Sequence, residues 1–161
     1  MGQGFKSEYL NTVGADFAYY SEKVGDTLYK YAIWDLAGQP KFTNVRPLFY
    51  QGAFGALVVF DVSRPETLKN LDFWINELVK NTRTEGVPMI IVANKMDLYE
   101  EGKSVSREEA MKYVEKLRER FGDEFQIGYI ETSAKTGMNI KEAFSMLRDY
   151  IVEWQDKISS F

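Results

Sequence analysis

Short apolar runs alternate with amphipathic segments along most of this chain. Three mostly apolar runs, at 56–62, 89–93 and 127–130, are typical of strands buried on both faces of a parallel sheet. Apolar residues at helical spacing follow each run, and these stripes are Leu68, Leu71, Ile75 and Leu78; Ala110, Val114, Leu117 and Phe121; and Ile140, Phe144, Leu147, Ile151 and Trp154. The alternation predicts an α/β fold with a mostly parallel sheet and flanking helices.

The starts of the predicted helices carry polar signals. Ser63 is followed three residues later by Glu66, and Ser106 by Glu109. In such a pair the serine and the glutamate each bond a free N–H of the first turn, so both segments predict a capping box. The third helix is expected to begin at Asn139.

The region before the first apolar run has a different pattern. Residues 16–20 and 28–34 are rich in aromatic and β-branched residues, and Gly25-Asp26 lies between them. This pattern predicts a β-hairpin. No repeat or Gly/Ser-rich linker interrupts the 161 residues, so one domain over 1–161 is expected.

The amino-acid composition excludes several kinds of metal site and catalytic group. The chain has no cysteine and no histidine, which excludes thiolate and imidazole metal ligands and cysteine or histidine catalysis. A bound metal ion would have oxygen ligands, as magnesium prefers. The net charge of −4 argues against nucleic acid as a partner. No secretory signal is recognised at the start, so a cytoplasmic location is expected.

Polar motifs stand where the predicted strands end, which is where ligands bind in parallel α/β folds. They are D-L-A-G-Q at 35–39, N-K-M-D at 94–97 and S-A-K at 133–135. In this order the three motifs resemble those of the small GTPases of the Ras superfamily. The segments that resemble the Rab branch in particular are 13–17, 30–34, 49–53 and 58–62.

The resemblance implies a guanine-binding site. Asp97 would accept the N1 and N2 protons of the base, Asn94 would tie the base loops together, and the stem of Lys95 would cover one ring face. The other implied base contacts are Ser133 and Ala134 at the guanine O6, Lys135 on the opposite face and Phe5 at the edge of the ring.

The resemblance also implies a second part of the nucleotide site, which binds the phosphates and Mg²⁺. Thr12 and Asp35 would hold Mg²⁺, Gly38 would bond the γ-phosphate, and Gln39 would orient the attacking water as the catalytic residue. The implied function is a switch between GTP and GDP, with effector, exchange-factor and GTPase-activating proteins as partners and a role in vesicle traffic. Taken singly, Asp35 and Asn94 also suit a purely structural role in turns.

One expected motif is not found in the sequence. The family's phosphate loop, G-x-x-x-x-G-K-[ST], has no match, and around Gly102-Lys103-Ser104 its first glycine would fall on Asp97. We therefore expect a domain without its first strand, phosphate loop and most of the first helix. Three explanations stay open: a shortened sequence, a relative that lost the loop, or a strand supplied by another chain.

These departures leave a second function open. A non-catalytic module could bind partner proteins through the hairpin aromatics, and GTP hydrolysis is expected to be weak or absent without the phosphate loop. Leu36 and Pro40 also differ from the usual Thr and Glu of the family. Membrane contact is unsupported because the chain has no cysteine to carry a prenyl group.

Overall fold

The computed structural model describes residues 15–36, 44, 46–83 and 86–160. Two compact units make up the chain, Met1–Gln51 and Gly52–Phe161. Each unit contains its own sheet, of two and of three strands respectively.

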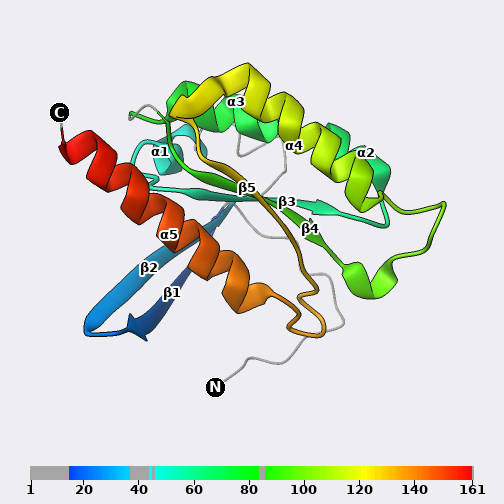
Figure 1. The fold of residues 1–161 in the computed structure, drawn as a ribbon, viewed down its shortest axis with the longest axis horizontal. Coiled ribbons are helices and arrows are strands. Elements are labelled where there is room, and N and C mark those ends of the chain that lie inside the picture. Colours follow the sequence, from blue (N-terminus) through cyan, green and yellow to red (C-terminus); the bar gives the residue numbers. More distant parts are fainter. Residues whose placement is uncertain (1–14, 37–43, 45, 84–85, 161) are drawn as a thin grey trace. The chain divides into compact units, whose positions relative to one another are not determined.

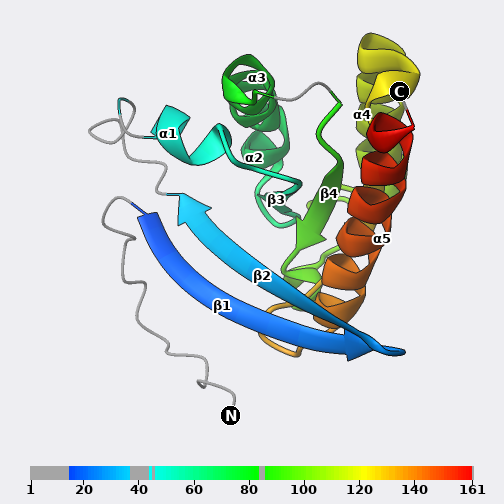
Figure 2. The same ribbon diagram turned by 90° about the vertical axis from the view of Figure 1, so that its left-hand side faces the viewer.

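The first unit contains the predicted hairpin. Strands β1 (Ala15–Val24) and β2 (Thr27–Leu36) pair antiparallel along their whole length and form a long twisted ribbon (Figure 2). Gly25 in the turn has a φ of 58°, which glycine adopts without strain. The hairpin prediction is confirmed, and the structure adds a short helix, α1 (Arg46–Tyr50), which the hydrophobic pattern did not indicate.

Aromatic side chains gather on the hairpin. The ring centroids of Phe17 and Trp34 are 4.6 Å apart, and Phe17 meets Tyr19 edge to face at 4.9 Å. These rings are still 42%, 48% and 75% exposed for Phe17, Trp34 and Tyr19. The contact between Phe17 and Trp34 joins the two strands and stabilises their pairing, while much apolar area stays uncovered.

The second unit contains the predicted parallel sheet. Its strands are β3 (Ala56–Asp61), β4 (Met89–Asn94) and β5 (Ile127–Glu131), in the order β3-β4-β5 (Figure 1). All described pairings in this sheet are parallel. Five of the six β4 residues are buried, as expected for a strand covered on both faces. The parallel α/β prediction is confirmed.

Helices cover both faces of this sheet. Helices α3 (Leu71–Asn81) and α4 (Arg107–Phe121) lie on one side, and α5 (Ile140–Ser159) lies on the other (Figure 1). The short α2 (Pro65–Lys69) precedes α3, and the 3₁₀ turns η2 (Met96–Leu98) and η3 (Gly122–Glu124) follow β4 and α4. Because α3 and α4 each connect successive strands in the order β3-β4-β5, right-handed crossovers place both on the same face.

Apolar stripes of the helices meet the strands as their spacing predicts. On the α5 face, Ile90, Val92 and Leu147 form a buried cluster. A Cβ on Gly128 would lie 2.7 Å from the Ile90 side chain and 3.1 Å from that of Met146, so glycine lets α5 approach β5 closely. On the other face the fully or nearly fully buried stripe residues are Leu71, Ile75, Leu78, Ala110, Val114 and Leu117.

The predicted helix starts had different outcomes. Ser106 and Glu109 form a complete capping box at the start of α4, as expected. The capping box predicted at Ser63 is wrong, because α2 begins at Pro65 and Arg64 is the N-cap residue. The helix expected through this region is also divided, with Asn70 between α2 and α3.

No helix among the described residues is both long enough and apolar enough to cross a membrane.

Candidate functional site

Three strands of the second unit end at the same edge of their sheet. In the ladder, Asp61 at the end of β3 is paired with Asn94 at the end of β4. Backbone bonds continue beyond the strands, since the Val62 N–H donates to the Asn94 carbonyl at 3.0 Å and the Met96 N–H donates to the Thr132 carbonyl at 3.1 Å. The loops that follow the strands are therefore held together by backbone hydrogen bonds.

Asn94 connects the loops after β4 and β5. Its Oδ1 accepts a hydrogen bond from the Thr132 hydroxyl and one from the Ala134 N–H, both at 3.1 Å. Thr132 is only 1% exposed, so this amide oxygen satisfies a buried donor. The Ala134 N–H, which the family resemblance assigns to the guanine O6, is thus occupied by Asn94 here. A base in this position would share or replace that hydrogen bond.

Asp97 is held by two residues of the loop after β5. The Ser133 hydroxyl donates to Asp97 Oδ1 at 2.5 Å, and Lys135 Nζ lies 3.8 Å from Asp97 Oδ2. The side chain of Asp97 is only 14% exposed, while that of Lys135 is 60% exposed. Each carboxylate oxygen has two lone pairs, so the carboxylate retains capacity to accept further N–H donors.

Ser133 in turn is fixed by its own loop. It is 1% exposed, its hydroxyl accepts from the Thr136 N–H at 3.2 Å, and its carbonyl accepts from the Gly137 N–H at 2.8 Å. The orientation of its hydroxyl toward Asp97 is therefore set by the backbone of the turn. Ser133, Ala134 and Lys135 reach the site as one rigid turn.

Lys95 turns back toward β3. Its backbone is left-handed, with a φ of 66°, which is uncommon for a residue other than glycine. Its Nζ lies 2.7 Å from Asp61 Oδ2, and Ser63 donates to the other oxygen of Asp61 from its N–H at 2.9 Å and its hydroxyl at 2.6 Å. Burial alone would raise the pKa of Asp61, but the bonds from Lys95 and Ser63 hold that pKa below its ordinary value.

No motif in the sequence assigns a role to Asp61 or Thr132, two further residues of this cluster. Thr132 immediately precedes the S-A-K motif, and Asp61 closes an otherwise apolar run. Because Asp61 and Asn94 end neighbouring strands of a parallel sheet, their positions in the sequence were the available signal.

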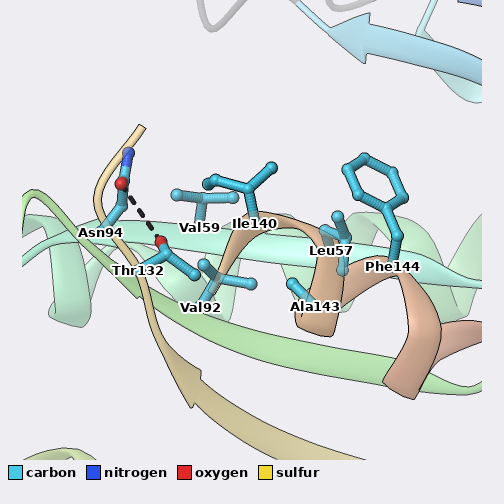
Figure 3. Close-up of a pocket in the computed structure, with 8 residues that line it drawn as sticks. All are labelled: Leu57, Val59, Val92, Asn94, Thr132, Ile140, Ala143 and Phe144. Carbon is cyan, nitrogen blue, oxygen red and sulfur yellow. Dashed lines mark hydrogen bonds between the residues drawn. The ribbon is translucent and has the colours of Figure 1, made fainter. Parts of the chain in front are cut away.

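A shallow pocket opens beside the loops on the α5 face of the sheet (Figure 3). It has a volume of about 110 Å³, and only Asn94 and Thr132 give it polar side chains. Its apolar lining comes from β3, β4 and the first turns of α5, namely Leu57, Val59, Val92, Ile140, Ala143 and Phe144. Asp97 does not line it, so the pocket and the carboxylate expected to recognise guanine are separate features.

Of the residues predicted for the phosphate and magnesium side, the described part of the chain contains Asp35 alone. Asp35 lies near the end of β2 and is exposed. Thr12, Gly38, Gln39 and Phe5 lie outside the described residues. Among the residues that are described, no group of three or more acidic side chains is arranged to hold a metal ion.

Comparisons with known proteins agree with the motifs. Residues 1–153 match the model of the Ras family. The chain is 33% identical over 150 residues to "Ras-related protein Rab-13" of Rattus norvegicus, covering 92% of this chain and 69% of that protein. It is 38% identical over 147 residues to "Ras-related protein RABA6b" of Arabidopsis thaliana, covering 87% of this chain and 57% of that protein.

These matches cover the segment that contains all three motifs and most of both units. They support a small GTPase switch of the Rab type and give no support to the alternative of a non-catalytic interaction module. The parallel sheet and the clustered loops after β4 and β5 fit the same assignment. The chain belongs to the Ras family and is similar to its Rab branch.

Proposed function

We propose that this chain binds guanine nucleotides through the loops after β4 and β5 and alternates between GTP-bound and GDP-bound states. The observation that carries the proposal is the Asp97 carboxylate, which is fixed by Ser133 and Lys135 next to the Asn94 hydrogen bonds. We also propose that residues 1–161 form one domain.

The chemistry of the base explains why a fixed carboxylate suits this role. Guanine presents two neighbouring N–H donors, at N1 and N2, and an ionised carboxylate is an acceptor with two oxygens. Adenine has an acceptor at N1, which would face Asp97 with lone pair against lone pair. We propose that Asp97 selects guanine and that Ser133 keeps its carboxylate aligned.

The phosphate side is proposed from the motifs. Thr12 and Asp35 would hold Mg²⁺ through oxygen ligands, Gly38 would bond the γ-phosphate, and Gln39 would orient water for hydrolysis of GTP. A switch of this kind has effector, exchange-factor and GTPase-activating proteins as partners. A cytoplasmic location and a part in vesicle traffic complete the proposal.

Titration of the full chain with fluorescent GDP in the presence of Mg²⁺ tests the proposal. Saturable binding is expected, with competition by GDP and none by ADP, and Asp97→Ala should abolish it. Asp123→Ala is the matched control, because it removes an exposed aspartate from η3 and the same charge. Phosphate release from GTP by the unchanged chain and by Gln39→Ala then tests hydrolysis separately.

Two results would contradict this function. One is a folded chain that binds no GDP, and the other is equal competition by ADP and GDP. Binding that Asp97→Ala and Asp123→Ala reduce equally would remove Asp97 from its proposed role, because the loss would then follow the charge alone.

A further inference from the structure

The ion pair between Asp61 and Lys95 differs from the other lysine pairs of the described residues. The Lys95 and Asp61 side chains are 31% and 10% exposed. The pairs Lys103–Glu100 and Lys112–Glu108 have both side chains exposed by more than 60%, and in the pair Lys135–Asp97 the lysine is 60% exposed. Exposed pairs contribute little to stability, whereas a sheltered pair with fixed geometry constrains both partners.

The two oxygens of Asp61 have separate partners. Oδ1 accepts both hydrogen bonds from Ser63 and so stabilises the turn between β3 and α2. Oδ2 lies 2.7 Å from Lys95 Nζ. The turn needs only the first oxygen, so the second oxygen can be altered while the turn is kept.

The contact between Lys95 and Asp61 Oδ2 matters because of where Lys95 lies in the chain. Lys95 directly follows Asn94 and precedes η2, which contains Asp97. Its left-handed backbone and its anchored ammonium fix the two ends of a four-carbon stem. The stem therefore has few rotamers left, and it crosses from the loop after β4 to the end of β3.

We infer that Asp61 is a positioning residue for nucleotide binding, which acts by anchoring Lys95 so that its stem forms a preorganised apolar wall for the face of the purine. The inference rests on the proposed function. The anchored ammonium is also neutralised, so the wall presents methylene groups to the base instead of a mobile cation. Preorganisation of this kind raises affinity because less side-chain entropy is lost on binding.

A wall against the ring face has a different signature from a contact at the ring edge. Face packing depends little on the exocyclic groups of the base, whereas Asp97 would distinguish guanine from hypoxanthine, which lacks the 2-amino group. Loss of the Asp61 anchor should weaken GDP and inosine diphosphate by the same factor. Loss of Asp97 should remove the preference for GDP.

Asp61→Asn in the full chain is the main test. Its side-chain oxygen still accepts from Ser63, but its NH₂ group cannot pair with Lys95. We expect affinity for both diphosphates to fall about tenfold, with their ratio unchanged. Ser63→Ala is the matched control, since it loosens the turn and leaves the ion pair, and it should change affinity by less than about twofold.

Lys95→Met tests the same contact from the other side and serves even where Asp61→Asn does not fold. It keeps a flexible apolar stem without the anchor, so it should weaken both diphosphates about as much as Asp61→Asn does. In the double variant the second change should add almost nothing, because the two residues act through one contact.

The outcomes separate this inference from the function on which it rests. A folded, unchanged chain that binds neither diphosphate overturns the proposed function and the inference with it. Normal GDP binding combined with equal effects of Asp61→Asn and Ser63→Ala overturns the inference alone. So do additive losses in the double variant, or a selective loss of GDP in Asp61→Asn.

Discussion

Two turns of the second unit contain a serine followed three residues later by a glutamate, and their hydroxyl groups have different partners. Before α4, the Ser106 hydroxyl accepts from the Glu109 N–H at 3.2 Å, and the Glu109 carboxylate accepts from the Ser106 N–H at 2.9 Å. After β3, the Ser63 hydroxyl instead donates to Asp61 at 2.6 Å. Ser106 and Glu109 therefore cap α4, whereas Ser63 holds the Asp61 carboxylate at the end of β3.

The neighbours of each serine explain the difference. Proline is favoured at the first helical position, so α2 begins at Pro65 and Arg64 is its N-cap residue. Ser63 therefore lies one residue before the position from which a side chain can cap this helix. The Asp61 carboxylate lies two residues before Ser63 and accepts a charge-assisted hydrogen bond from its hydroxyl. The Ser106 hydroxyl also donates to a carboxylate, that of Glu109 at 3.1 Å, and its oxygen still accepts from the Glu109 N–H. The capping pattern therefore fails at Ser63 because Pro65 places the N-cap position at Arg64, one residue too late for this serine.

Of the substitutions at these two turns, Asp61→Ala should lower the unfolding free energy most. It removes the acceptor of both Ser63 bonds and leaves Lys95 without its anion, so we expect unfolding free energy to fall by about 2 kcal/mol. Urea denaturation of the full chain measures the change, with Asp123→Ala as the control for lost surface charge. A loss no larger than that of Asp123→Ala would mean that Asp61 does not organise this turn.

Removing each hydroxyl should have unequal effects. Ser106→Ala removes a helix cap and should lower the unfolding free energy by about 1 kcal/mol. Ser63→Ala removes only the hydroxyl bond to Asp61, because the Ser63 N–H still donates to the same carboxylate, and should lower it by about 0.5 kcal/mol. Ser106→Thr keeps the capping oxygen and should recover most of the loss. Equal costs at the two serines would remove the distinction between capping and supporting hydroxyls.

Acid should act on the β3 turn through Asp61. Its pKa is lowered in the folded chain, so its carboxylate contributes stability above the ordinary pKa of 3.8, and that contribution is lost as pH falls through the lower folded value. The stability difference between the unchanged chain and Asp61→Asn should be constant near neutral pH and shrink below about pH 4. Thermal denaturation over this range measures it, and a difference that grows on acidification would contradict it.

The sequence predicted the elements that depend on periodic burial. The apolar runs at β3, β4 and β5, the stripes of α4 and α5, and the hairpin turn at Gly25 all appear as expected. In each, local preference and tertiary packing agree. The short helix α1 has no comparable apolar stripe, so the sequence did not indicate it. The break at Asn70 between α2 and α3 was not indicated either, because the apolar spacing continues across it.

The candidate site was predictable to the extent that motifs mark strand ends. Asn94, Asp97 and Ser133 were expected together from their motifs, and hydrogen bonds link their loops. The position of Asp61 at a strand end was visible in the sequence, but its bond to Lys95 was not, because that contact depends on strand register and on a left-handed backbone at Lys95. Neither property is visible in residue spacing.

The smallest expected effect distinguishes the two glutamates. Glu66 bonds to Arg64 at 2.8 Å with both side chains more than half exposed, and the pKa of Glu66 is lowered by its own backbone N–H and by Arg64. Since it caps no helix, Glu66→Ala should leave the denaturation midpoint unchanged, and alanine is a good helix former. Glu109→Ala should lower the midpoint, by less than Ser106→Ala, because it breaks half of a working capping box. Equal losses at both glutamates would show that a negative charge in the first turn matters more than the cap, since the helix dipole acts on both alike.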